Sequence, residues 1–157
     1  MKLSVVALSL AVSAPLVVHA EDLTIGELEH GIFQAPQQEI AAGERLIVAG
    51  AQPVVETTSI PARLGLRFGL RYRLTDDSYV DKPVVKLLYL TPGINDPDSG
   101  KRLDKIELVQ ELSADSNYHL MAFEFTDPAE LTTGEWRFFV FAEDRKLAEQ
   151  AFDVVAE

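Results

Sequence analysis

The chain has 157 residues, 47% of them hydrophobic, with no cysteine and a formal net charge of −11 at pH 7. A chain of this length and composition is expected to form one domain whose core needs neither a disulfide nor a metal. The negative charge repels phosphate groups, so it argues against nucleic acid or an anionic membrane surface as the partner of the whole molecule.

The first twenty residues have the pattern of a secretory signal peptide. Lys2 supplies the positive charge, Leu3–Val18 the apolar stretch, and Val18-His19-Ala20 a cleavage site of the small-residue type. The apolar stretch is shorter than the ~20 residues of a membrane-spanning helix. We therefore expect cleavage after Ala20 and a periplasmic or secreted domain over 21–157 that is not inserted in a membrane.

The next part of the chain predicts one strand and two short strand candidates. Residues 23–34 (LTIGELEHGIFQ) predict the first strand, in which Gly31 is expected to mark a bulge or bend. Glycine and proline then interrupt the sequence repeatedly. Between these interruptions, 45–49 and 54–60 are the two short candidates.

The clearest pattern is LGLRFGLRYRLT at 64–75, where apolar side chains alternate with arginine and glycine. This period of two predicts a long β-strand with one face on a core and the other toward water. The predicted core face consists of Leu64, Leu66, Phe68, Leu70, Tyr72 and Leu74. The predicted solvent face consists of Gly65, Arg67, Gly69, Arg71 and Arg73.

Three more strands are predicted in the middle of the chain. The apolar run at 84–90 suits a strand buried on both faces. Segments 105–112 and 117–126 alternate between apolar and polar residues, as half-buried strands do. The segment 91–103 contains two prolines and two glycines and predicts irregular structure.

The C-terminal part predicts a hairpin. Asp127-Pro128 first predicts a single helical turn, because aspartate caps helices and proline suits their first position. Segments 134–142 (GEWRFFVFA) and 147–155 (LAEQAFDVV), joined by a short charged turn, then predict two paired strands. Phe139 and Phe141 are expected on the outer face. The side chains expected in the core are Trp136, Phe138, Val140, Phe152 and Val154.

Seven to eight short strands without a convincing long helix favour an all-β antiparallel β-sandwich, with a closed β-barrel as the alternative. Two segments, PARLGLRFGLRYRL at 61–74 and GEWRFFVFAEDRKLAEQAFDV at 134–154, resemble the bacterial family known as domain of unknown function 3859. The resemblance implies a secreted protein with an immunoglobulin-like sandwich, and it brings no catalytic residues. The chain departs from antibody domains because it lacks their cysteine pair and carries its one tryptophan on the penultimate strand.

The sequence contains no arrangement typical of an enzyme or a metal site. Outside the predicted signal peptide it has two histidines, His30 and His119, and it lacks a Gly-x-Ser-x-Gly motif. His119 is expected at a strand end with its ring tip in solvent. The acidic segments 76–81 and 95–100 carry oxygen ligands that suit calcium, but the same residue types build ordinary turns. We therefore predict a non-enzymatic protein without a cofactor.

A basic stripe is the first candidate binding site. Arg67, Arg71 and Arg73 span roughly 20 Å on one face of the predicted strand, and guanidinium groups suit a carboxylate-rich peptide or an acidic glycan. The alternative is that glutamates on neighbouring strands neutralise them in cross-strand pairs. The glutamates available for such pairs are Glu107, Glu111 and Glu124.

The pair Phe139 and Phe141 is the second candidate site. Side chains two residues apart on a strand stand about 7 Å from each other, and exposed aromatic pairs suit stacking on sugars or burial in a protein partner. The alternative is that segment 36–60 folds over both rings as a second small core.

These observations favour a non-catalytic binding domain that offers a sheet face or an edge strand to a protein partner. A carbohydrate-binding module that uses the two phenylalanines and the arginines is the alternative. A hydrolase is less favoured, because no acid or base with a perturbed pKa can be located.

Overall fold

The computed structural model describes residues 23–34, 53–75, 82–96, 98–113, 116 and 118–157. The predicted signal peptide and its cleavage site, the candidate strand 45–49 and the acidic residues Asp76, Asp77 and Asp81 lie outside this part of the chain. In the part described, no helix has the length and apolar character needed to cross a bilayer.

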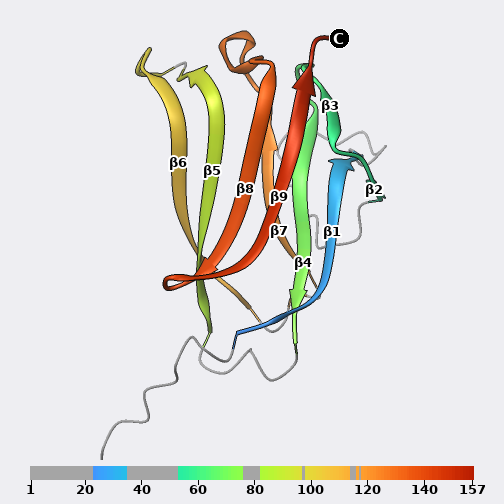
Figure 1. The fold of residues 1–157 in the computed structure, drawn as a ribbon, viewed down its shortest axis with the longest axis vertical. Helices are drawn as coiled ribbons and strands as arrows, with labels where there is room; N and C mark the ends of the chain where they lie inside the picture. Colours follow the sequence, from blue (N-terminus) through green and yellow to red (C-terminus); the bar gives the residue numbers. More distant parts are fainter. Residues whose placement is uncertain (1–22, 35–52, 76–81, 97, 114–115, 117) are drawn as a thin grey trace, which may run out of the picture.

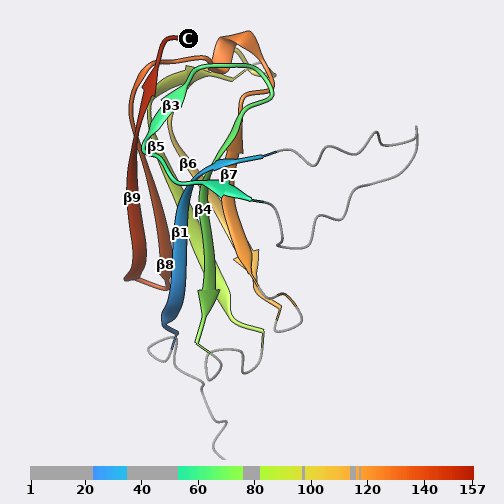
Figure 2. The same cartoon turned by 90° about the vertical axis from the view of Figure 1, so that its right-hand side faces the viewer.

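The described residues form two packed β-sheets that do not close into a barrel (Figure 1 and Figure 2). The four-stranded sheet has the order β2-β1-β4-β7 and the five-stranded sheet the order β3-β9-β8-β5-β6. Strands of the first sheet are β1 (Ile25–Phe33), β2 (Val54–Val55), β4 (Arg67–Leu74) and β7 (His119–Glu124). Strands of the second are β3 (Ser59–Pro61), β5 (Val84–Asn95), β6 (Arg102–Glu111), β8 (Gly134–Ala142) and β9 (Arg145–Val155). The predicted β-sandwich is therefore confirmed.

The predicted core strand at 64–75 is confirmed as β4. Its inward side chains, which are among the most buried of the protein, meet the aromatic residues of both sheets. Phe68 lies at the centre, with ring centroids 5.3–5.7 Å from those of four other aromatic residues. These four are Phe125, Trp136, Phe138 and Phe152. Leu64 departs from the prediction: it lies in a turn and is 49% exposed.

Segment 54–60 differs from the prediction of one strand. Val54–Val55 pairs with β1 in one sheet, whereas Ser59–Pro61 pairs in parallel with β9 in the other. The residues between them leave the extended pairing, with the backbone N–H of Ser59 donating to Thr57 Oγ1 at 3.1 Å. The chain thus passes from one sheet to the other within a few residues, which raises the number of strands to nine in the described residues.

The prediction of irregular structure over 91–103 is wrong for its two ends, because β5 continues to Asn95 and β6 begins at Arg102. A bulge between Leu90 and Ile94 accommodates Pro92, which cannot donate to a sheet ladder. Thr91 Oγ1 holds the bulge by donating to the carbonyl of Leu103 at 2.7 Å. The outer face of β5 is half-buried or exposed, so the prediction of burial on both faces is also wrong.

The predicted first strand is confirmed as β1, but its bulge lies between Ile25 and Glu27 and not at Gly31. Gly31 has another role. A Cβ there would lie 2.0 Å from the carbonyl oxygen of Val55, and the φ angle of 142° disfavours any other residue. Glycine at this position therefore permits the close approach of β2.

The C-terminal predictions are confirmed. Asp127 caps a single 3₁₀ turn, η3 (Pro128–Glu130), and Glu130 accepts hydrogen bonds from the preceding backbone. Strands β8 and β9 form the expected hairpin, with Trp136 fully buried and its indole N–H donating to the carbonyl of Thr132 at 3.2 Å.

Candidate functional site

The predicted arginine stripe lies on the outer face of the four-stranded sheet, and each arginine faces a glutamate. Arg67 Nε donates to Glu124 at 3.0 Å, across the β4–β7 pair. Arg71 and Arg73 pair instead with Glu29 and Glu27 of β1. The cross-strand alternative is therefore the arrangement present, and a binding role for the stripe stays a prediction.

Sequence reasoning identified Glu124 but missed the two glutamates of β1. Glu107 and Glu111, which it offered instead, pair with Lys105 and Lys82 on the other sheet. The alternation of Glu27 and Glu29 with apolar neighbours indicated that both point to one face of β1. It did not indicate that β1 lies beside β4, because that pairing joins segments 42 residues or more apart.

Tyr118 extends this network on the same face. Its hydroxyl donates to Glu27 at 3.0 Å, and the Arg71 guanidinium lies 4.9 Å from the centre of its ring. The hydrogen bond to Glu27 is the main cause that raises the pKa of Tyr118. The charges of this face are thus engaged with each other.

Phe139 and Phe141 lie on the outer face of the five-stranded sheet, as predicted. Their rings are stacked, with centroids 6.0 Å apart and an angle of 24° between the planes. The Lys86 ammonium lies 5.7 Å from the centre of the Phe141 ring, and the Lys146 ammonium lies 6.0 Å from that of Phe139. Each ring therefore already has a cation and a second ring beside it, which leaves less free surface for a sugar.

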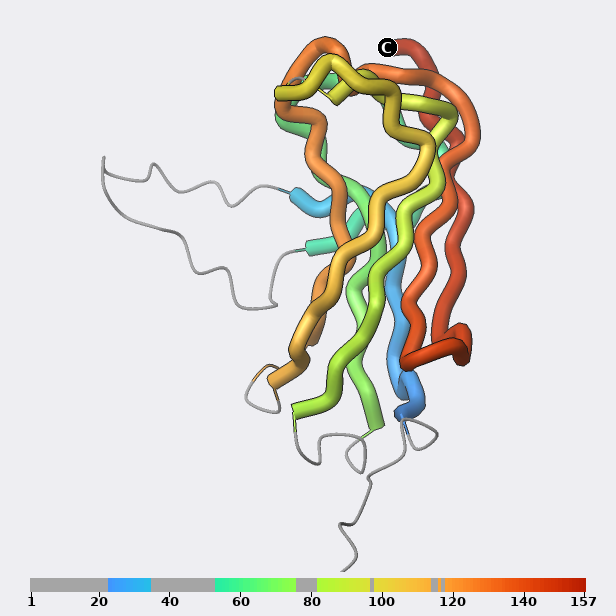
Figure 3. Tube along the Cα trace, turned by 90° about the vertical axis from the view of Figure 1, so that its left-hand side faces the viewer, coloured from blue at the N-terminus to red at the C-terminus, as the bar shows by residue number. Residues whose placement is uncertain are grey.

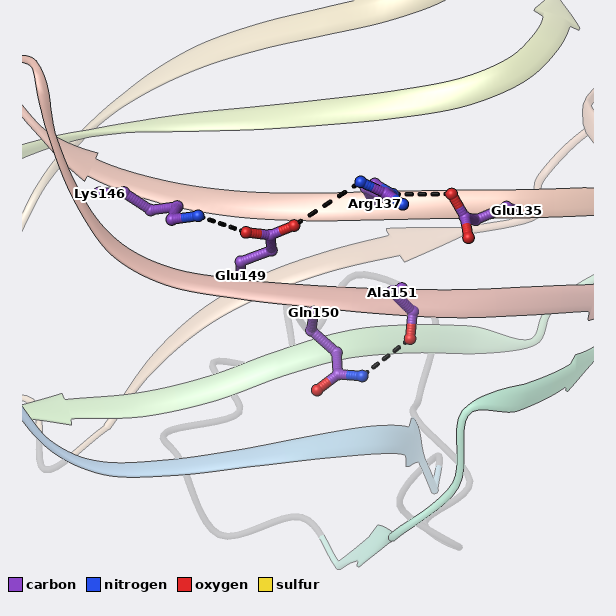
Figure 4. Close-up of polar contacts among 6 residues, drawn as sticks. All are labelled: Glu135, Arg137, Lys146, Glu149, Gln150 and Ala151. Carbon is purple, nitrogen blue, oxygen red and sulfur yellow. Dashed lines mark hydrogen bonds and ion pairs between the residues drawn. The ribbon is translucent and has the colours of Figure 1, made fainter.

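A row of charges crosses β8 and β9 near these rings (Figure 4). Lys146 pairs with Glu149, which lies 3.9 Å from Arg137, and Arg137 in turn donates to Glu135 at 2.7 Å. The hydrogen bond from Lys146 is the main cause that lowers the pKa of Glu149. The described part of segment 36–60 holds β2 and the start of β3, which lie at other edges and do not cover the two rings, and the rest of the segment lies outside the described residues.

The edge strands β6 and β7 lie on the same side of the sandwich (Figure 3), and in the part of the chain that the structure describes no strand joins them. A groove of about 510 Å³ lies there. Its apolar lining includes Leu87, Leu108 and Leu120, and the Arg67–Glu124 ion pair also borders it. We call this side, consisting of β6, β7 and the groove, the open side.

Two tyrosines connect the sheets across the open side. The hydroxyl of Tyr72 donates to Gln110 Oε1 at 3.1 Å, and that of Tyr89 donates to the carbonyl of Ala122 at 3.3 Å. Burial raises the pKa of Tyr89 to about 12, so its hydroxyl stays a neutral donor. Each contact thus links a strand of one sheet to a strand of the other at this side.

Strand β6 exposes apolar side chains on both of its faces. Leu108 pairs with the buried Leu87 and so faces the other sheet, yet it is 51% exposed because β6 is the last strand of its sheet. Val109 faces outward and is 76% exposed. The sequence predicted the alternation of β6 correctly but held no signal for this exposure.

Among the strands that the structure describes, β5 alone pairs with β6, on one side of it. The N–H of Leu112 donates to the carbonyl of Pro83, on the β5 side. Because backbone groups of an antiparallel strand point alternately to its two sides, the opposite side presents a set of odd-numbered residues. They are Lys105, Glu107, Val109 and Glu111. In the described ranges no strand pairs with this edge.

One of the two histidines differs from its predicted setting. His119 is buried and not at the solvent, with its ring 5.7 Å from that of Tyr72, and burial lowers its pKa. His30 is half-buried, 6.3 Å from the Phe152 ring. Within the described ranges, no group of three or more histidine, aspartate or glutamate side chains is placed to hold a metal ion. Asp96 of the acidic segment accepts hydrogen bonds from Asp98 and Ser99, as turn residues do.

The fold and its edges define an immunoglobulin-like β-sandwich. The crystal structure of an immunoglobulin-like protein from Pseudomonas aeruginosa is similar to it, with a TM-score of 0.70 and 41% identity over 85% of this chain and 96% of that chain. The chain belongs to the family described as domain of unknown function (DUF3859), which matches residues 18–154. No curated protein matches the chain. The resemblance found in the sequence is thereby confirmed.

Proposed function

We propose that this protein is a non-catalytic interaction domain that binds a protein partner through its open side. The observation that carries the proposal is the edge of β6, which combines available backbone groups with the exposed side chains of Leu108 and Val109. An extended segment that adds to such an edge gains main-chain hydrogen bonds, while pockets for alternate side chains provide specificity. The groove beside Leu108 supplies such a pocket.

The other candidate surfaces support the proposal less well. The arginines of β4 are engaged by glutamates, and the two outer phenylalanines are engaged by lysines and by each other. Natural edge strands are usually short or carry proline, charged side chains such as lysine, or inward-pointing charge. Of these features, β6 has the charged side chains of Lys105, Glu107 and Glu111. Strand β6 has ten residues without proline, and its central inward residue is leucine.

A proline substitution tests the proposal. Proline at Val109 removes an N–H from the free edge and leaves the β5 side intact, since proline is tolerated on edge strands. Val109→Pro should abolish retention of the partner from an extract of the native periplasm, whereas Val109→Thr, which keeps the N–H and the branched shape, should retain it. Equal retention by the two variants would contradict binding through β6.

We also propose that the protein acts in the periplasm or outside the cell. The support is the charged start, the apolar stretch and the cleavage pattern of residues 1–20. N-terminal sequencing of the exported protein should give Glu21 as its first residue. An exported protein that begins with Met1 would contradict the signal peptide.

A further inference from the structure

We infer that the partner of the open side is a second copy of this chain, joined by antiparallel pairing of β6 with β6 and with Leu108 on the two-fold axis. The inference rests on the proposed function and specifies its partner. It follows from the backbone groups at the edge, from the charges of β6, and from the groove.

The backbone sets which residues can pair. The N–H and C=O groups at the free edge belong to the odd-numbered residues from Lys105 to Glu111, because Leu112 directs its N–H to Pro83 on the other side. A two-fold axis at Leu108 places Lys105 opposite Glu111 of the second copy, and Glu107 opposite Val109. Each of these four edge residues then has a partner in the second copy.

The charges fit this register and disfavour the two adjacent ones. With Leu108 on the axis, each Lys105 faces the Glu111 of the other copy, so two pairs of opposite charge form across the interface. A shift of the axis to residue 107 places Glu107 opposite itself. A shift to residue 109 places Glu107 opposite Glu111. Both alternatives put like charges directly opposite each other, which is destabilising.

The existing partners of these side chains oppose the rearrangement only weakly. Lys105 pairs with Glu107 at 2.6 Å, and Glu111 pairs with Lys82 at 3.4 Å. All four side chains are about half exposed or more, and ion pairs in such positions contribute little to stability. Exchange for a pair across the interface therefore costs little.

The groove accounts for the apolar part of the interface. On the axis, the two Leu108 side chains form a non-hydrogen-bonded pair, in which side chains approach most closely. Both lie on the groove side of the sheet, since each faces the same way as the buried Leu87. The two grooves join over the axis, and the exposed half of each Leu108 becomes covered.

Charge reversal tests the inference. Sedimentation equilibrium of the purified protein should show a dimer. Lys105→Glu and Glu111→Lys should each weaken the dimer at least tenfold, because each places like charges opposite each other twice. The double variant, with both changes, should restore it. Lys101→Glu, an equal charge change in the exposed turn before β6, should leave the dimer unchanged.

The outcomes separate this inference from the proposed function. A wild-type protein that stays monomeric at high concentration, or a double variant that fails to dimerise, overturns the β6 dimer. If the monomer nevertheless retains a different protein through the edge, as judged by Val109→Pro against Val109→Thr, the proposed function stands. Melting temperatures of all variants near that of the wild type exclude unfolding as the cause.

Discussion

The two sides of the sandwich differ in whether a segment of the chain joins the two sheets. On one side, a single short segment joins the sheets: β2 pairs with β1, and β3 pairs with β9 a few residues later. On the other side, β6 and β7 end their sheets without a strand between them in the described residues, and two tyrosine hydroxyls reach across. We call the first the closed side.

The two sides also differ in the partners of the backbone groups at their edge strands. On the closed side, backbone groups at the edge find partners within the chain, as when the N–H of Asp153 donates to the carbonyl of Thr58 at 2.8 Å. On the open side, no strand within the described ranges pairs with the equivalent groups of β6, and we propose that a second chain does. Substitutions in the core, on each side and on the outer face of β4 test this difference.

The largest effect is expected in the core between the two sides. Trp136 is fully buried, with its ring centroid 4.9 Å from that of Phe123. Trp136→Ala should lower the free energy of unfolding by ~3–5 kcal/mol, because neighbouring side chains cannot fill the cavity. Leu108→Ala, on the open side, should cost the monomer about 1 kcal/mol or less, since the leucine is half exposed in the single chain. Urea unfolding measures both, and similar losses would contradict the assignment of Leu108 to an open edge.

The second effect concerns the closed side. Gly31→Ala places a Cβ against the Val55 carbonyl at a φ of 142°, so β2 must move away. The loss of stability should be about 2 kcal/mol or more. Gly26→Ala is the matched control, because its Cβ would lie 3.4 Å from the Thr75 side chain, an ordinary contact. Equal effects in urea unfolding would show that β2 does not need the glycine.

The third prediction is that His119, on β7 at the open side, makes the free energy of unfolding depend on pH. Burial lowers the pKa of His119 in the folded protein below its ordinary value of 6.5. The unfolded chain therefore takes up a proton first as the pH falls, so the stability present above about pH 6.5 is lost below it. His119→Phe should have a shallower decrease in the free energy of unfolding between pH 7 and pH 5. The same slope in both proteins would mean that His119 is protonated without cost.

The smallest effect is expected on the outer face of β4. Arg71→Ala together with Arg73→Ala removes two ion pairs to β1, and partly exposed pairs contribute about 0–1 kcal/mol each. The double variant should lose little stability and should bind its partner like the wild type. A sharp, salt-dependent loss of partner binding would instead make the arginine stripe a recognition surface.

Much of the fold could be predicted because the signals are local. Alternation in β4 and in the hairpin β8–β9 determines which side chains face the core, since neighbouring residues of a strand point to opposite faces. The capped turn at Asp127 likewise depends on residues within one turn. For these elements, the residues that determine the structure lie close to one another in the sequence.

Other features follow only from the tertiary structure. The pairing of Arg71 with Glu29 follows from β1 lying beside β4, and the division of residues 54–60 between two sheets follows from where each edge ends. In the alternating pattern of its strand, Leu108 occupies an inward-facing position, as the buried leucines do in their strands. It is exposed because β6 is the last described strand of its sheet. The residues around Leu108 in the sequence do not indicate whether another strand pairs with β6.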